Sequence, residues 1–160
     1  MLKTKNDIAS ANRGKLIELI NARLADCIDL STQVKVAHWN VRGPHFIGLH
    51  ELFDKIYADV VEAIDLIAER AGQLGGLALG TARQVAKAST LPEYPADIVS
   101  GKDHVRALST ALASFGKDVR AAIDQAEDLD DKDTADMFTE ISRDVDKNTW
   151  FVEAHLQADE

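Results

Sequence analysis

The chain is poor in cysteine, in proline and in long apolar runs, and each shortage excludes a class of protein. Its single cysteine cannot form an internal disulfide or a cysteine-based zinc site, which fits a reducing cytoplasm. Only three prolines and nine glycines interrupt 160 residues, and this favours long helices over many short strands. No apolar run is long enough to span a membrane, and the N-terminal residues lack the apolar segment of a signal peptide. We therefore expect a helical cytoplasmic protein.

The charge of the chain is acidic overall but basic at its beginning. A formal net charge of −9 disfavours nucleic acid and favours cations as partners, although solubility alone also accounts for it. The first fifteen residues carry four basic side chains and one acidic one, namely Lys3, Lys5, Arg13, Lys15 and Asp7. We predict a short basic N-terminal tail over residues 1–12 and one domain over residues 13–160.

Apolar residues recur every three or four positions in four long segments, which predicts four amphipathic helices. The expected helices cover residues 12–40, 47–74, 102–126 and 133–155, with a short extra helix near 81–88. Residues 76–101 make one long connection between the second and third of these helices. A four-helix bundle with one long crossover has the ferritin-like topology, whereas cytokine-type bundles need two. The predicted fold is therefore all-α and ferritin-like.

The second predicted helix carries polar residues on a face away from its apolar stripe. His50, Asp54, Asp65 and Glu69 fall within about 100° of the helix circumference. His38, at the end of the first helix, would lie beside His50 if the two helices pack antiparallel. Imidazoles with carboxylates suit iron, and also zinc or manganese. The alternative is an ordinary solvated face, which charged helical stripes often are.

A single chain cannot close a metal site from these residues. Asp54 and Asp65 are about 16 Å apart along the helix axis, whereas metal–ligand bonds are only about 2 Å long. A second antiparallel copy of the helix, related by a twofold axis, would create two equivalent sites. His38, His50 and Asp54 would then come from one subunit, and Asp65 and Glu69 from its partner. No histidine follows a Glu-x-x-His pattern, so a di-iron centre within one chain is not expected.

Several spaced motifs resemble those of the Dps family (DNA protection during starvation) over roughly residues 15–156. They are KVAHWNVRG (35–43), Phe46, LHE (49–51), Asp54, Asp65, AER (68–70), QLGGLALG (73–80), YP (94–95), TAD (134–136), SRDVDK (142–147) and WF (150–151). The resemblance implies a hollow dodecamer of ferritin-like subunits. It also implies an intersubunit ferroxidase site that binds two irons through the five residues named above.

The resemblance further implies an activity, and it leaves one alternative open. A family member would oxidise Fe(II), preferentially with hydrogen peroxide, store ferric mineral inside the shell and so protect DNA. Trp39, next to His38, would trap stray oxidising equivalents or simply pack at an interface. The alternative is mainly a DNA-binding, nucleoid-compacting structural protein that acts through Lys3 and Lys5. Twelve tails on one shell would add to each other's affinity for DNA.

Other acidic, histidine and cysteine side chains are assigned outside the ferroxidase site. An acidic turn between the last two helices is expected to line a threefold pore that admits iron. The candidate pore residues are Glu127, Asp131, Asp133 and Asp136. The remaining histidines, His45, His104 and His155, are expected to be surface or loop residues. Cys27 is expected to lie in the core.

Overall fold

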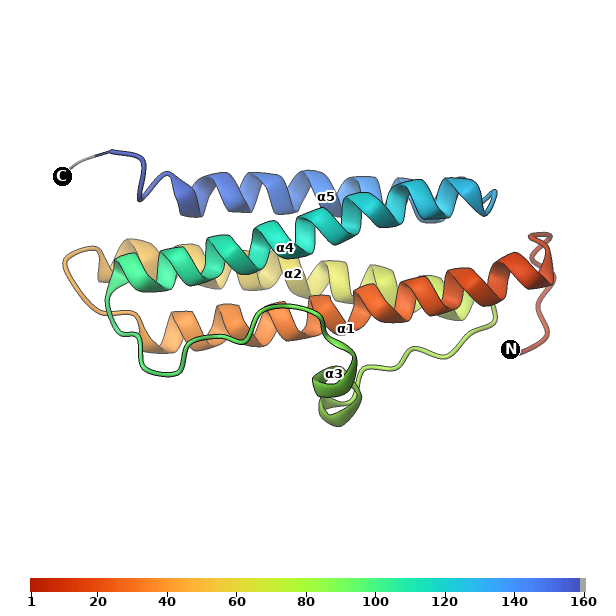
Figure 1. The fold of residues 1–160 in the computed structure, drawn as a ribbon, viewed down its shortest axis with the longest axis horizontal. Helices are drawn as coiled ribbons and strands as arrows, with labels where there is room; N and C mark the ends of the chain where they lie inside the picture. Colours follow the sequence, from red (N-terminus) through yellow and green to blue (C-terminus); the bar gives the residue numbers. More distant parts are fainter. Residues whose placement is uncertain (159–160) are drawn as a thin grey trace.

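The computed structural model describes residues 1–158, and within them it contains five helices and no strand. The helices are α1 (Ser10–Asn40), α2 (Phe46–Gln73), α3 (Ala82–Ala88), α4 (Gly101–Asp128) and α5 (Lys132–Glu153). The four long helices form a bundle in which α1 and α5 run in one direction and α2 and α4 in the other (Figure 1). The predicted all-α bundle is confirmed. No helix in the described part of the chain is long and apolar enough to cross a membrane.

Glycines and a serine fix the ends of the helices. Gly43 lies in the α1–α2 turn with a φ of +119°, and Gly75 follows α2 with a φ of +83°, both of which glycine adopts readily. The Gly75 N–H donates to the Gly72 carbonyl at 2.9 Å. At the start of α4 the Ser100 hydroxyl oxygen accepts from the Asp103 N–H at 3.2 Å and so caps the helix.

The long crossover returns the chain from one end of the bundle to the other, passing through α3 beside α1 (Figure 1). Carboxylates of α1 hold it in place. Asp26, which is fully buried, accepts from the Thr90 N–H at 2.7 Å, and Asp29 accepts from the Ser89 hydroxyl at 2.6 Å. These bonds satisfy backbone and side-chain groups of a segment that has little regular structure. The crossover therefore lets α2 and α4 run parallel.

Large apolar side chains fill the centre of the bundle, among them Phe53, Phe115 and Phe138. Cys27 is fully buried there, as expected. The expectation for His104 was wrong, because only 1% of this residue is exposed. It lies on the inward face of α4, where the Tyr94 hydroxyl is 2.6 Å from its Nδ1, so a crossover residue supplies the polar partner that burial requires. His45 and His155 are exposed, as expected.

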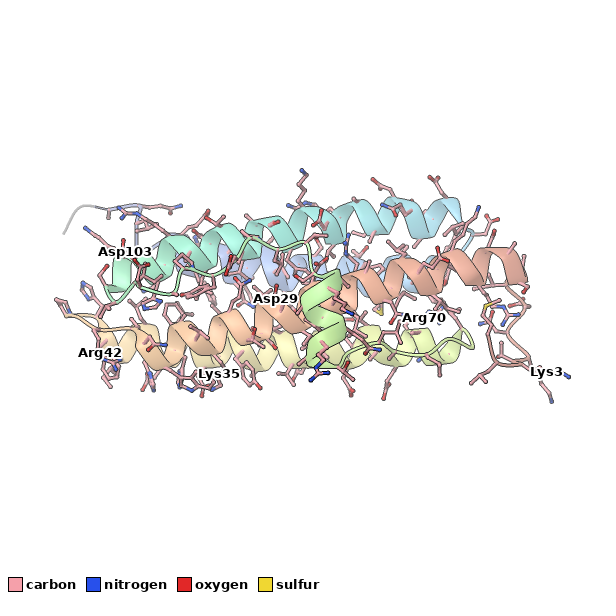
Figure 2. All side chains as sticks on the ribbon, turned by 60° about the horizontal axis from the view of Figure 1, so that its bottom comes forward. Lys3, Asp29, Lys35, Arg42, Arg70 and Asp103 are labelled. Carbon is pink, nitrogen blue, oxygen red and sulfur yellow. The ribbon has the colours of Figure 1, made fainter. Side chains whose placement is uncertain are left out.

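The N-terminal residues lie against the end of the bundle. The Leu2 N–H donates to the Gly75 carbonyl at 2.7 Å, just beyond α2. The Arg13 guanidinium, within α1, donates to the carbonyls of Ile8 at 3.1 Å and Leu74 at 3.2 Å. Residues 1–9 thus precede the first helix but make backbone contacts with the domain, while Lys3 stays exposed at the far end of the bundle (Figure 2).

Candidate metal site on helices α1 and α2

The last turn of α1 and the first turns of α2 place two histidine rings against each other. The rings of His38 and His50 stack with their centroids 3.6 Å apart and their planes 21° from parallel. Each Nδ1 lies 2.8 Å from the other residue's backbone carbonyl oxygen. A carbonyl oxygen only accepts, so each Nδ1 must carry the proton. A neutral ring of this tautomer presents an unprotonated Nε2, which is the form that binds a metal ion.

Asp54 lies one turn after His50 and adds a carboxylate to the histidine pair. Its side chain accepts a hydrogen bond from the Lys35 ammonium group of α1, and the same ammonium lies 4.7 Å from the centre of the Tyr57 ring. The hydrogen bond from Lys35 lowers the pKa of Asp54, the positive charge of Lys35 acts in the same direction, and desolvation opposes them without outweighing them. Asp54 is therefore held as a carboxylate beside the imidazoles.

Asp65 and Glu69 are exposed on α2, but they lie toward its other end. Lys35, which contacts Asp54, and Arg70, which follows Glu69 in the chain, lie well apart along the bundle (Figure 2). Among the described residues, no group of three or more histidine, cysteine, aspartate or glutamate side chains is close enough to hold a metal ion. One chain thus stacks His38 against His50, places Asp54 one turn further along α2, and leaves Asp65 and Glu69 apart from them.

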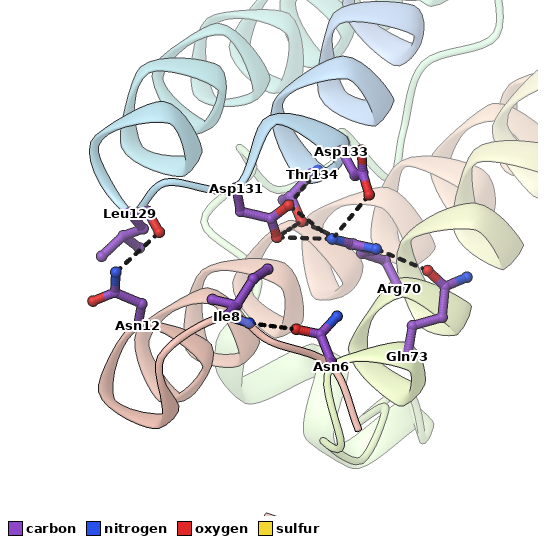
Figure 3. Close-up of polar contacts among 9 residues, drawn as sticks. All are labelled: Asn6, Ile8, Asn12, Arg70, Gln73, Leu129, Asp131, Asp133 and Thr134. Atoms are coloured by element: carbon purple, nitrogen blue, oxygen red, sulfur yellow. Dashed lines mark hydrogen bonds and ion pairs between the residues drawn. The ribbon is translucent and has the colours of Figure 1, made fainter. Parts of the chain in front are cut away.

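Arg70, next to Glu69, belongs to a buried network that joins α2 to the α4–α5 turn (Figure 3). Its Nη2 donates to both carboxylate oxygens of Asp131, at 2.7 and 2.9 Å, and its Nε donates to the Thr134 hydroxyl at 2.9 Å. Burial would raise the pKa of Asp131, but hydrogen bonds from Thr134 and Arg70 outweigh it and lower the pKa. The Asp131 side chain also accepts from the Thr134 N–H and so caps α5.

This network corrects one of the expected pore residues. Asp131 is only 2% exposed and both its oxygens are engaged within the chain, so it does not offer a free carboxylate to a pore. Glu127 and Asp133 line an open cleft of about 560 Å³, together with Asp130, Asp131 and, from the N-terminal segment, Asp7. Asp136 is exposed on α5 outside that cleft. For Glu127, Asp133 and Asp136 the role in a pore stays a prediction.

Sequence reasoning missed Lys35 as a contact of the candidate site. The signal was present, since Lys35 is three residues before His38 and residues three apart share a helix face. The hydrogen bonds between each histidine and the other residue's backbone carbonyl could not be predicted from residue spacing, because they depend on how α1 packs on α2. Trp39, predicted beside the site, is 61% exposed at the end of α1.

Comparisons with known proteins agree with this fold and these motifs. Residues 17–160 match the family model of the ferritin-like domain, which places the bundle in that class. The chain is 44% identical over 155 residues to the DNA protection during starvation protein of Agrobacterium fabrum, covering 97% of this chain and 96% of that one. The chain therefore belongs to the Dps family of ferritin-like proteins.

Solved structures of relatives superpose closely on the bundle. Mycobacterium smegmatis Dps in its tetragonal form gives a TM-score of 0.94 at 30% identity, covering 99% of this chain and 95% of that one. Dps from Microbacterium arborescens, described in its high-iron form, gives a TM-score of 0.87 at 30% identity, covering 99% of this chain and all of the other. The ferritin-like topology expected from the helix pattern is thus confirmed.

Proposed function

We propose that this protein is a ferroxidase and iron store, which oxidises Fe(II) at a site shared by two subunits and keeps the ferric product inside a dodecameric shell. The observation that carries the proposal is the stacked pair of His38 and His50, whose Nδ1 atoms are both bonded to carbonyls, beside the carboxylate of Asp54. Neutral imidazoles with carboxylates form the mixed nitrogen and oxygen ligand set that suits iron. The relative described in a high-iron form supports iron as the substrate.

The partner subunit would complete the site. Asp65 and Glu69 stand exposed on α2 about 16 Å or more from Asp54 along the helix axis. An antiparallel second α2 brings the partner's Asp65 and Glu69 to the histidine pair and, by symmetry, creates a second equivalent site. Each shared site then holds two irons between ligands of both chains.

The proposed reaction balances with hydrogen peroxide as the oxidant. Two Fe(II) ions each give one electron, the O–O bond breaks, and with two protons two water molecules form. Holding both metal ions and the peroxide together delivers the two electrons within one site, so that no hydroxyl radical escapes. Trp39 follows His38 directly and is exposed, which suits an electron donor for a stray oxidising equivalent. We expect dioxygen to be the slower oxidant.

Protection of DNA would follow from removing Fe(II) and peroxide, and direct DNA binding is a second candidate. Lys3 and Lys5 are exposed and two residues apart on the N-terminal segment, so twelve copies would offer a repeated basic surface. Binding that weakens steeply with salt and disappears when residues 1–11 are deleted would support this mechanism. Binding that survives the deletion would exclude these lysines.

The iron reaction is tested by adding hydrogen peroxide anaerobically to the Fe(II)-loaded protein and following ferric absorbance and peroxide consumed. Rapid oxidation with about two irons per peroxide, and a ferric product that stays in solution with the protein, is the expected result. The variant D65A/E69A serves as the matched control, because both changes lie on an exposed face of α2. A wild-type rate no faster than a protein-free solution would contradict the proposal and leave DNA binding as the main role.

A further inference from the structure

A tyrosine of the crossover and the buried histidine of α4 form a pair that the proposed iron site does not use. The Tyr94 hydroxyl oxygen lies 2.6 Å from the His104 Nδ1, and the two rings are 19° from parallel. His104 is 1% exposed and Tyr94 is half-buried, so solvent does not reach the histidine side of this bond. The two side chains therefore make a closed unit in which a proton can pass from one to the other without water.

The proton of this bond rests on the tyrosine. A separation of 2.6 Å is typical of O–H donors and shorter than the usual range of N–H donors, so Tyr94 donates and the His104 Nδ1 accepts. Burial raises the pKa of the Tyr94 phenol and lowers the pKa of His104, so both groups are neutral near neutral pH. The proton thus moves only when the chemistry of the phenol itself changes.

Loss of one electron is such a change. A phenol that has lost an electron is a strong acid and must release its hydroxyl proton, and Nδ1 is already in place to accept it. Burial and the charge of Arg42 oppose the imidazolium that results, while the Asn40 carbonyl and Asp103 favour it. Electron loss by Tyr94 can therefore be coupled to transfer of one proton along an existing hydrogen bond.

The pair adjoins the end of α1 that carries the candidate metal site. Asn40, whose backbone carbonyl acts on His104, follows His38 by two residues and Trp39 by one. The exposed Trp39 meets oxidants from solution before the half-buried tyrosine does. An oxidised tryptophan takes an electron from a tyrosine that can release its proton, so the position of the pair suits the last station of such a transfer.

We propose that Tyr94 and His104 are a redox-active pair, in which Tyr94 gives one electron to a one-electron oxidant formed near α1 while its hydroxyl proton moves to the His104 Nδ1. With a hydroxyl radical as the oxidant, the products are hydroxide, a neutral tyrosyl radical and an imidazolium. One Fe(II) ion then returns the electron and becomes Fe(III), and the proton moves back to the tyrosine. The source of the oxidant and this return step rest on the proposed function, whereas the redox activity of the pair does not.

The chain contains a natural comparison, because Tyr57 is its only other tyrosine. The Tyr57 ring lies 4.7 Å from the Lys35 ammonium, and within the described residues its hydroxyl has no histidine or carboxylate to accept a proton. A nearby positive charge makes removal of an electron harder, and the lack of a base leaves the proton without an acceptor. The radical should therefore form on Tyr94 and not on Tyr57.

Flash photolysis of the iron-free, full-length protein tests the pair without the iron reaction. A tris(bipyridyl)ruthenium(III) oxidant made by a laser pulse removes one electron, and transient absorption with electron paramagnetic resonance identifies the radical. The wild type and Y57F should give the same yield of tyrosyl radical, whereas Y94F should give tryptophanyl radical only. In H104Q the side chain still hydrogen-bonds but cannot take the proton, so oxidation of Tyr94 should slow by about a hundredfold.

Two results would overturn the proposal. An undiminished tyrosyl yield in Y94F would place the radical on Tyr57, and an unchanged rate in H104Q would remove the histidine from the reaction. Thermal unfolding checks that both variants keep the fold. If H104Q does not fold, the wild type in heavy water replaces it, because proton transfer to His104 predicts slower radical formation there and electron loss alone predicts no change.

Freeze-quenching of the reaction with Fe(II) and hydrogen peroxide then links the pair to the iron site. The wild type should oxidise about two irons per peroxide, and Y94F fewer, because the oxidising equivalent is lost to side chains that Fe(II) cannot restore. A flash-generated Tyr94 radical in a protein that does not oxidise iron would refute the proposed function alone. Rapid iron oxidation by a protein that gives no Tyr94 radical after the flash would refute the pair alone.

Discussion

The two ends of α2 are built in opposite ways. Near its beginning, His50 is half-buried and Asp54 is exposed, and the Asp54 carboxylate accepts from the ammonium of Lys35, which is itself partly accessible. Near its end, Arg70 is 8% exposed and donates to three side chains of its own chain, including the buried Asp131. The first group of residues keeps ligand atoms available, whereas the second has satisfied them internally.

This difference separates residues that stabilise the fold from residues whose polar atoms remain available to a partner or a substrate. Buried polar groups must be hydrogen-bonded within the chain, and Arg70 with Asp131 meets that requirement. The exposed carboxylates of α2 face no such requirement, so their alignment with the half-buried His50 on one helix face needs another explanation. The shared metal site proposed above would supply it. Four variants test this contrast, and the one with the greatest predicted effect comes first.

Removing the exposed carboxylates should abolish catalysis and spare the fold. In D65A/E69A the rate of iron oxidation should fall to that of a protein-free solution, because each iron loses its ligands from the second subunit. The thermal midpoint should move little, since both residues are exposed. Stopped-flow absorbance and calorimetry measure the two quantities. Oxidation at the wild-type rate would remove Asp65 and Glu69 from the site.

Removing the buried guanidinium of Arg70 should destabilise the fold rather than abolish catalysis. R70A leaves the Asp131 carboxylate buried without its cation, and we expect the free energy of unfolding to fall by about 3 kcal/mol. The control R120A removes Arg120 from an exposed pair with Asp146 and should cost less than about 1 kcal/mol. Thermal unfolding at one protein concentration compares them. Equal midpoints for the two variants would show that the Arg70 network is not a structural anchor.

Replacing Lys35 tests whether its ammonium group competes with a metal ion for the Asp54 carboxylate. The Lys35 ammonium occupies the carboxylate of Asp54 that a metal ion must use, so K35M should bind Co(II), as a probe for Fe(II), more tightly by up to about fivefold. The control K55M removes a lysine paired with Asp59 on the same helix and should leave the affinity unchanged. Anaerobic titration calorimetry gives both affinities. Weaker binding in K35M would mean that Lys35 orients Asp54 and does not compete for it.

The smallest effect concerns pH and the buried His104. Burial lowers its pKa, and the charge of Arg42 acts in the same direction, while the Asn40 carbonyl and Asp103 oppose them. A folded-state pKa below the unfolded value of about 6.5 means that stability is present above pH 6.5 and is lost as the pH falls below it. Between pH 7 and pH 5 the wild type should therefore lose more stability than H104Q, measured by thermal unfolding. Parallel pH profiles would contradict this assignment.

The sequence predicted the elements that depend on local pattern and missed contacts that depend on packing. Helix limits followed from apolar periodicity, and each long helix ends within two residues of its expected position. The alignment of His50 with Asp54 and Asp65 needed only the helical repeat. Asp131 was misassigned because its partner Arg70 is 61 residues away. His104 was misassigned although it lies four residues before Leu108 and eleven before Phe115 on the buried face of α4; its partner Tyr94, in the crossover, carries no such signal.

The most direct test of a site shared between subunits is complementation. The variant H38A/H50A lacks the histidine half and D65A/E69A lacks the acidic half, so neither alone should oxidise iron faster than a protein-free solution. When the two are unfolded and refolded together, mixed pairs contain one complete site of two, and random pairing should restore about a quarter of the wild-type rate. Recovery to that level is the predicted result. No recovery above the separate variants would contradict a site built from two chains.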